Sequence, residues 1–297
     1  MGLLPRCVLV ERPTEYAELL ARHGTREQAR FFLHERARTL GEVEARHTAL
    51  QDARAGVLAA IPPDWRRARV LRSELDRFLF EPEDVVLVLG QDGLVANLAK
   101  YLDGQPVLGL NPEPERWPGV LVRHPPSAAG DLMADVAAGR AKTQRRTMAA
   151  ARLDDGQELL ALNEIFVGHA SHQSARYTLE LGERSERQSS SGLIVTTGTG
   201  ATGWAASVHR ERHSALTLPA PEEERLAFFV REPWPSAATG ATLDEGVLSP
   251  GGLLVVQSEM NEGGVVFGDG IEADHLELDW GQRVEVSVAA SKLRLVS

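Results

Sequence analysis

A short apolar run that ends in a glycine-flanked carboxylate constrains the fold of this chain most strongly. Val85 to Leu89 is uniformly apolar and rich in β-branched residues, which is typical of a strand buried on both faces of a parallel sheet. Gly90-Gln91-Asp92-Gly93 follows directly, and the next apolar residues have helical spacing: Leu94, Val95, Leu98 and Leu102. The pattern predicts a strand, a tight turn and a helix. Asp92 would then lie at the carboxyl end of the strand, where open α/β sheets bind ligands.

Two interpretations of this turn stay open on the local sequence. Glycine on both sides of Asp92 would let the backbone come close to a phosphate or a sugar. Glycine and aspartate are also common in ordinary solvated turns, so the tetrapeptide alone does not decide between a site and a connection.

The composition excludes several classes of protein. A chain of 297 residues that is 43% hydrophobic can bury the core of one large domain or of two. Its formal net charge of -10 argues against binding to nucleic acid or to an anionic membrane. Cys7 is the only cysteine, which excludes an internal disulfide and a thiolate zinc cluster. The longest apolar runs reach about half a dozen residues, whereas a membrane span needs about 20, and we expect a cytoplasmic protein.

The first part of the chain alternates apolar runs with helical patterns. Thr25 to Gln28 is a capping box that predicts a helix continuing to Arg38. Strands are predicted at Cys7–Glu11, Ala68–Leu71, Val85–Leu89 and Gln105–Leu110. This alternation predicts an open parallel α/β domain over residues 1–125.

The sequence pattern changes from alternating strands and helices to successive strands after a proline-rich stretch and a short helix predicted at Ala128–Arg140. From Gln144 onward the chain is strand after strand, with Asp155-Gly156 as a hairpin signal. The predicted strands are Arg146–Leu153, Leu159–Val167, Ala175–Leu181, Gly192–Thr197, Leu226–Val230, Leu253–Ser258, Leu276–Leu278, Val284–Val288 and Leu293–Val296. We therefore expect a mostly antiparallel, sandwich-like β domain over residues 126–280.

A loop dense in glycine and threonine follows the apolar run Leu193 to Val195. Gly198, Gly200 and Gly203 formally match the dinucleotide pattern G-x-G-x-x-G, which would suggest an NAD-dependent dehydrogenase. The pattern lies in the β-rich half, and no acidic residue ends a strand about 20 residues later, as a Rossmann unit requires. The hydroxyls favour a polar loop that hydrogen-bonds a nucleotide, with Trp204 available to stack on a base.

Asn163 and Glu164 interrupt the middle of an otherwise apolar strand. One of two adjacent strand residues must point inward, and a buried amide or carboxylate is costly unless it is paired. The pair would suit the diol of a ribose, or it lies at a hairpin edge where both side chains reach water. Arg145 and Arg146 look like a solvated strand end, although they could reach a phosphate. No metal site is expected, because His169 with His172 and His209 with His213 lack a third ligand.

Several motifs together resemble the NAD kinase family, and most closely its mitochondrial-type branch. They are the Asp92 turn, the Asn163-Glu164 pair, and Ser190–Leu193 leading into Thr197–Gly200 and Trp204. Further matches are Gly109–Arg116, Arg231–Pro233 and Phe267–Gly270. Diacylglycerol and sphingosine kinases share the glycine-flanked aspartate, so a lipid kinase is a less favoured alternative. The resemblance implies two domains, with the chain end, residues 281–297, returning to the first.

The resemblance implies a phosphoryl transfer to the 2′-hydroxyl of the adenosine ribose of NAD, which yields NADP. The donor would be ATP, another nucleoside triphosphate or polyphosphate. Asp92 would be the catalytic base, and Gly90 and Gly93 would leave the phosphate path open. Mg²⁺ would arrive with the donor and not in a preformed protein site.

The same resemblance implies the nucleotide-binding residues. Asn163 and Glu164 would hold hydroxyls of the nucleotide. The loop would supply hydrogen bonds and a stacking face through Thr199, Thr202, Gly203, Trp204 and Ser207. Ser191 would contact nucleotide bound to a neighbouring subunit, which implies a homodimer or a larger homo-oligomer.

One residue of the turn departs from the family pattern. Gln91 stands where the family has a second glycine, and Leu94 where it often has threonine. A glutamine adopts positive φ far less readily than a glycine. Either its amide donates a hydrogen bond to a phosphate, or donor binding is lost and the chain is a non-catalytic NAD(P)-binding homologue.

Overall fold

The computed structural model describes residues 4–297, and the chain divides into two compact units. Unit 1 contains the chain up to Tyr101, Gln105–Thr143 and Arg294–Ser297. Unit 2 contains Leu102–Gly104 and Gln144–Leu293. The two units are the α/β part and the β-rich part that the sequence predicts.

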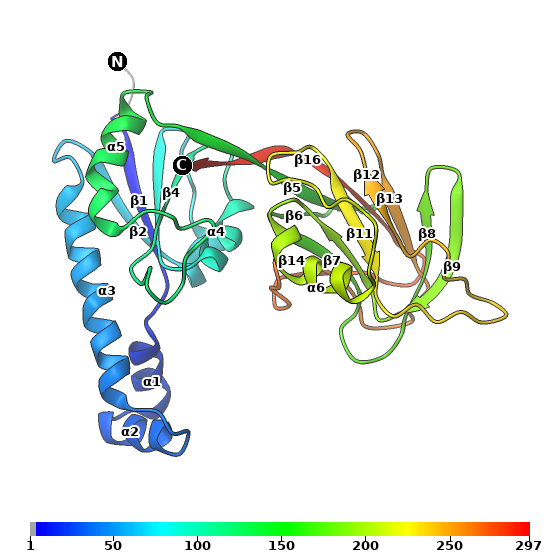
Figure 1. The fold of residues 1–297 in the computed structure, drawn as a ribbon, viewed down its shortest axis with the longest axis horizontal. Coiled ribbons are helices and arrows are strands. Elements are labelled where there is room, and N and C mark those ends of the chain that lie inside the picture. Colours follow the sequence, from blue (N-terminus) through cyan, green and yellow to red (C-terminus); the bar gives the residue numbers. More distant parts are fainter. Residues whose placement is uncertain (1–3) are drawn as a thin grey trace. The chain divides into compact units, whose positions relative to one another are not determined.

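Unit 1 is built on a parallel sheet with the strand order β2-β1-β3-β4 (Figure 1). Its strands are β1 (Arg6–Glu11), β2 (Arg66–Leu71), β3 (Asp84–Leu89) and β4 (Pro106–Leu110). Every residue of β3 is buried, as the uniformly apolar run predicts. The order reverses direction between β1 and β3, so the carboxyl ends of these two strands flank a topological switch point.

The end of the chain completes this sheet. The last residues of β16 (Arg283–Val296) pair in parallel with β4, Arg294 opposite Pro106 and Leu295 opposite Val107. Leu295 and Val296 are buried. The predicted return of the chain end to the first domain is confirmed, and within unit 1 it comprises Arg294–Ser297.

Helices cover the sheet of unit 1 on both faces. Residues of α3 (Leu40–Ala60) and α5 (Ala129–Ala137) pack in one hydrophobic core with β1, β3 and β4, and α4 (Asp92–Ala99) lies on the other side (Figure 1). The N-terminal end of α3 packs against α1 (Glu15–His23) and α2 (Arg26–His34). Threonine side chains cap α1, α2 and α3 by accepting backbone N–H groups: Thr14, Thr25 and Thr39.

Unit 2 is a sandwich of two sheets. One has the order β16-β13-β8-β9 and is extended by β5 and β6, and the other has the order β12-β11-β10-β7-β14-β15. The strands are β5 (Thr143–Leu153), β6 (Glu158–Ala161), β7 (Glu164–His169), β8 (Ala175–Leu181), β9 (Arg184–Ser190), β10 (Leu193–Thr196), β11 (Leu226–Val230), β12 (Glu245–Leu248), β13 (Leu254–Ser258), β14 (Gly264–Gly268) and β15 (His275–Glu277). Tyr177 and Val256 of one sheet share a buried core with Val167 and Phe228 of the other. Helix α6 (Trp204–Glu211) follows β10.

Several elements differ from the sequence-based expectation. The predicted strand Leu159–Val167 is two strands, because the chain turns at Leu162 and Asn163. The predicted helix Thr25–Arg38 ends at His34, since Ala37 has a φ of 51°. The predicted strands Val284–Val288 and Leu293–Val296 are one continuous strand, β16.

The unit bounds also differ from the expected domain bounds. Unit 1 extends beyond the expected boundary at residue 125 to Thr143, because Ala129 and Met133 of α5 pack into its core against Val57 and Ile61. Within residues 4–297, no helix combines the length and the apolar character needed to cross a membrane.

Candidate functional site

The predicted strand, turn and helix around Asp92 are present in unit 1. Gln91 is the N-cap residue of α4, and its side chain makes no capping hydrogen bond. The Asp92 carboxylate instead accepts three backbone N–H groups, from Val120 at 2.8 Å, Leu121 at 2.7 Å and Val122 at 3.0 Å. Asp92 is therefore not a solvated turn residue, because three donors fix the orientation of its carboxylate.

A glycine of β4 makes this arrangement possible. A Cβ at Gly109 would lie 2.0 Å from the carbonyl oxygen of Leu121, so only glycine lets that segment approach the strand. His124 donates its backbone N–H to the Gly109 carbonyl at 3.1 Å, and Asn111 donates to the His124 carbonyl at 2.7 Å. The segment thus runs along β4 and presents its N–H groups to Asp92.

The two predicted glycines of the turn lie beside Asp92. A Cβ at Gly93 would meet no atom within 4 Å, and one at Gly90 would contact only Leu94. Gly93 is exposed at the start of α4, which suits an approach from solvent. Their role in leaving a phosphate path open stays a prediction.

In unit 2 an aspartate holds the turn at Asn163. The carboxylate of Asp269 accepts the backbone N–H of Asn163 at 2.6 Å and that of Leu162 at 3.1 Å. The backbone N–H of Asp269 donates to the Glu164 carbonyl at 3.0 Å. These bonds explain why the strand breaks here and give the Phe267–Gly270 motif a structural role.

The threonine and glycine loop packs directly on this turn. The Asn163 carbonyl accepts the backbone N–H of Thr197 at 2.9 Å, and the Thr197 hydroxyl donates to the Leu162 carbonyl. A Cβ at Gly200 would lie 2.2 Å from the Asn163 carbonyl oxygen. The loop and the Asn163-Glu164 pair, far apart in the sequence, therefore form one local site.

The glycine pattern of this loop is not a Rossmann fingerprint. β10 pairs antiparallel with both of its neighbours, β7 and β11, whereas a Rossmann unit continues into a parallel strand. The close contact at Gly200 shows that this glycine serves the packing of the loop on the turn.

Glu164 is the titratable group of this site with the clearest perturbation. Its side chain is largely buried, with 9% of the residue exposed. Burial, followed by the negative charge of Asp269, raises the pKa of Glu164 to about 7. Near neutral pH this carboxyl group exchanges between a form that only accepts hydrogen bonds and one that also donates.

An aromatic cavity of about 680 Å³ lies next to this loop in unit 2. The Trp204 ring stacks on Phe166 at 5.9 Å between centroids, and the Arg231 guanidinium lies 5.0 Å from the Trp204 centroid. Ser191, Phe267 and His275 also line the cavity. Its volume falls within the range of small-molecule sites, which is about 300–1,000 Å³.

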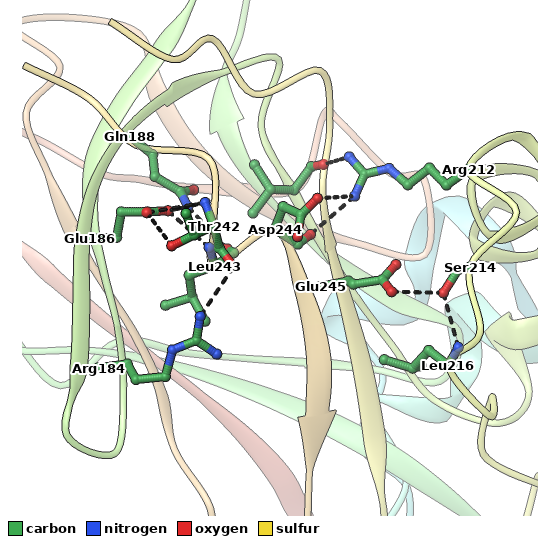
Figure 2. Close-up of polar contacts among 11 residues, drawn as sticks. Arg184, Glu186, Gln188, Arg212, Ser214, Leu216, Thr242, Leu243, Asp244 and Glu245 are labelled. Carbon is green, nitrogen blue, oxygen red and sulfur yellow. Dashed lines mark hydrogen bonds and ion pairs between the residues drawn. The ribbon is translucent and has the colours of Figure 1, made fainter. Parts of the chain in front are cut away.

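The segment that follows Arg231 is bound to β9 through contacts of Glu186 with Thr242 and Leu243 (Figure 2). The Glu186 carboxylate accepts the backbone N–H and the hydroxyl of Thr242 and the backbone N–H of Leu243, at 2.7–3.1 Å. Burial opposes ionisation of Glu186, but the bonds from Thr242, Leu243 and Gln188 outweigh it and lower its pKa to about 2. The start of the same segment is held by Ser191, whose backbone N–H donates to the Arg231 carbonyl at 2.9 Å.

The structure distributes the predicted site residues over four places. Asn163, Glu164 and Thr199 belong to the turn and the loop packed on it, and Ser191 and Trp204 line the aromatic cavity. Thr202, Gly203 and Ser207 are exposed at the start of α6. Asp92, Gly90 and Gly93 lie in unit 1.

Some residues of these sites were missed from the sequence. Arg146 is 1% exposed and donates to the Thr199 hydroxyl at 3.3 Å, so its assignment to a solvated strand end is wrong. Phe166 gave no signal of its own, and Asp269 was part of a motif match whose contact with Asn163 was not predicted, because the two residues are about 100 positions apart in the sequence.

No family model matches this chain, but curated relatives do. It is 34% identical over 133 residues to the NAD kinase of Methylococcus capsulatus, covering 42% of this chain and 44% of that protein. It is 27% identical over 242 residues to NAD kinase 2, mitochondrial, of Rattus norvegicus, covering 55% of this chain and 57% of that protein. The chain thus spans about half the length of these curated relatives.

Two solved structures share the fold along nearly the whole chain. Yeast NADH kinase in complex with NADH has a TM-score of 0.60 and 16% identity, covering 100% of this chain and 84% of the yeast chain. An NAD kinase from Archaeoglobus fulgidus in complex with ATP has a TM-score of 0.59 and 17% identity, covering 98% of this chain and 93% of the archaeal chain.

The fold therefore defines a two-domain protein of the class in which a parallel α/β part is joined to a β sandwich, as in these two kinases. In sequence the chain is similar to NAD kinases over about half of its length, and in fold it is similar to an NADH kinase and an NAD kinase.

Proposed function

We propose that this protein is an NAD kinase, which transfers a phosphoryl group from ATP or a related polyphosphate donor to NAD and so makes NADP. The observation that carries the proposal is the turn at Asn163 and Glu164, fixed by Asp269 and packed under the Thr197–Gly200 loop. This is the part of the chain in which the family motifs and a built polar site coincide.

Asp92 is the proposed catalytic base. The 2′-oxygen of the adenosine ribose forms a bond to the terminal phosphorus, the bond from that phosphorus to the bridging oxygen breaks, and the hydroxyl proton passes to the carboxylate. Because phosphoryl transfer has a loose transition state, alignment of the hydroxyl matters more than base strength. The three N–H donors on Asp92 supply that alignment by fixing the carboxylate.

The sites of unit 2 are proposed to bind the nucleotide acceptor. Asn163 and Glu164 would hold ribose and adenosine hydroxyls, and a carboxyl with a pKa of about 7 both accepts and donates such bonds near neutral pH. Trp204 offers a ring face in a cavity of suitable volume, with Arg231 beside it as a cation for a phosphate. The exposed Ser207 hydroxyl is a further donor, whereas the Thr202 hydroxyl, which donates to the Thr199 carbonyl at 3.1 Å, would accept a hydrogen bond.

Mg²⁺ is proposed to enter with the phosphate donor. The Asp92 oxygens already accept three N–H groups, which fits a metal carried by the donor better than one bound by this carboxylate. Bound to the donor phosphates, the ion would neutralise the charge that develops during transfer.

We further propose a homodimer or larger homo-oligomer in the cytoplasm. Ser191, which the family resemblance assigns to nucleotide of a neighbouring subunit, is exposed at the rim of the aromatic cavity. Light scattering coupled to gel filtration tests the assembly, and a monomer that forms NADP would contradict it.

The activity is tested by incubating the purified chain with NAD, Mg²⁺ and ATP, another nucleoside triphosphate or polyphosphate, and measuring NADP. We expect NADP with at least one donor. Binding of NAD without NADP from any donor would instead establish the non-catalytic alternative, and phosphorylation of diacylglycerol or sphingosine would establish a lipid kinase.

A further inference from the structure

A second, smaller cavity lies within unit 1, beside the Asp92 turn. It has a volume of about 150 Å³, and residues that follow β1, β3 and β4 line it together with α3. Gly90 and Gln91 come from the end of β3, and Arg12 from the end of β1. The cavity therefore lies at the β1/β3 switch point, where doubly wound sheets bind their ligands.

Cations face this cavity although the chain as a whole carries a net charge of -10. Arg12, Arg46 and Arg116 line it, together with the carboxylates of Glu15 and Glu113. Arg46 pairs with Glu15 at 2.8 Å, and Glu15 also pairs with Arg38. Within residues 4–297, Arg12 and Arg116 form no ion pair, which leaves two guanidinium groups available to an anion.

A neutral side chain holds one of these two guanidinium groups. The Nη2 of Arg12 donates to the Oε1 of Gln91 at 3.1 Å. An amide orients Arg12 without cancelling its charge, which a carboxylate in the same place would do. Because Arg12 is exposed, this bond also reduces the rotamer freedom that an anion would otherwise have to remove.

The cavity volume limits the ligand. Sites for whole small molecules occupy about 300–1,000 Å³, so a cavity of about 150 Å³ suits the phosphate chain of a nucleotide and not the whole nucleotide. Guanidinium groups match phosphate oxygens in geometry as well as in charge.

We propose that this cavity binds the phosphate chain of the donor, with Arg12 and Arg116 as its binding residues and Gln91 as the positioning residue of Arg12. The inference rests on the proposed kinase function and assigns its donor side. Gln91 then does not obstruct the turn but replaces a family glycine with a side chain that orients a phosphate-binding arginine.

The proposal is tested by calorimetric titration of the full chain with sodium tripolyphosphate, in the absence of NAD. We expect Arg12→Gln and Arg116→Gln each to weaken binding by about tenfold, the loss typical of one charge-assisted hydrogen bond. Arg77→Gln is the matched control, because Arg77 is an exposed arginine of unit 1 outside the cavity, where it pairs with Asp76 at 3.7 Å. Absence of binding to wild type, unchanged binding to Arg12→Gln, or an equal loss in the Arg77 variant would each overturn the proposal.

The role of Gln91 has its own test. Gln91→Ala should raise the KM for the donor several-fold and leave the KM for NAD and the melting temperature unchanged. The double variant with Arg12→Gln should bind tripolyphosphate no more weakly than Arg12→Gln alone, since Gln91 acts through Arg12. Additive losses, or a change in the KM for NAD, would contradict the positioning role.

Gln91→Glu separates orientation from charge. It keeps an acceptor for Arg12 but adds a negative charge, so we expect weaker tripolyphosphate binding than in Gln91→Ala. Binding as tight as in wild type would contradict the argument that a neutral partner is required. Since tripolyphosphate binding is measured directly, it fails or succeeds independently of whether NADP is formed.

Discussion

At the scale of the residue, single glycines and single carboxylates determine the local structure around Asp92 and around the Asn163-Glu164 turn. Gly109 and Gly200 each stand where a Cβ would lie about 2 Å from a carbonyl oxygen, and each lets a loop pack against the chain that carries a proposed functional residue. The sequence located Asp92, Glu164 and the Phe267–Gly270 motif, but not the contacts that these residues make. Asp92 binds backbone N–H groups of Val120 to Val122, and backbone donors leave no signature in the side-chain sequence.

Gly200→Ala should destabilise unit 2 and weaken NAD binding. The new Cβ would lie 2.2 Å from the Asn163 carbonyl, so either the loop or the turn must move, at a cost of about 1–3 kcal/mol. Chemical denaturation measures the loss. Gly56→Ala in α3 is the control, because its Cβ meets nothing within 4 Å and alanine favours a helix by about 0.5–1 kcal/mol. Equal stability of Gly200→Ala and wild type would contradict the packing role.

Glu164 should make stability depend on pH near neutrality. Its pKa in the folded state, about 7, lies above the ordinary value of 4.5, so the stability due to its neutral form is complete below pH 4.5 and is lost as the pH rises through 7. Relative to Glu164→Gln, wild type should therefore lose free energy of unfolding between pH 5 and 8, on the order of 2 kcal/mol. Denaturation at the two pH values measures this difference. A difference that does not change with pH would show that Glu164 titrates normally.

At the scale of the element, the hydrophobic pattern and the helix caps predict those strands and helices that form through local interactions. The buried strand β3 and the Thr25 cap follow from the sequence directly. β9 was not predicted because its residues are mostly polar and show no strand pattern. It forms a strand because it pairs with β8 along its whole length. The break between β6 and β7 was not predicted because Asp269, about 100 residues later, imposes it.

The segment between Arg231 and Asp244 should loosen when its carboxylate anchor is removed. Glu186→Ala deletes the acceptor of the Thr242 and Leu243 N–H groups, so both amides should exchange hydrogen faster (Figure 2). Since the pKa of Glu186 is lowered to about 2, the anchor is present above pH 4.5 and is lost as the pH falls through 2. Glu277→Ala, an exposed carboxylate of β15, is the control. Unchanged exchange at Thr242 and Leu243 would contradict the anchor.

At the scale of the whole molecule, the order of the motifs indicated the class of protein more specifically than the composition did. Charge and cysteine content excluded classes of protein, whereas the order of Asp92, Asn163-Glu164 and the glycine loop indicated the NAD kinases to which the chain is similar in sequence. The unit bounds could not be predicted as well, because α5 follows a proline-rich stretch and its membership depends on contacts with α3.

Removing residues 294–297 should destabilise unit 1. These residues pair with β4, and Leu295 and Val296 are buried there, where each apolar side chain contributes about 1.5–3 kcal/mol. Thermal unfolding should show a lower melting temperature for the truncated chain. A variant with Ser297→Ala controls for changes at the exposed last residue. An unchanged melting temperature would contradict a structural role for the returning strand.

The proposed role of the Asp92 carboxylate as the base of an NAD kinase is tested by comparing wild type with one variant. NADP formation from NAD, Mg²⁺ and the best donor is measured for wild type and Asp92→Asn, with NAD affinity measured alongside. Asp131→Asn serves as the control, because Asp131 is an exposed carboxylate of α5. We predict that Asp92→Asn lowers kcat by about 10²–10⁴-fold, the usual contribution of a positioned base, and leaves NAD affinity within about threefold. A kcat equal to that of wild type would contradict the account.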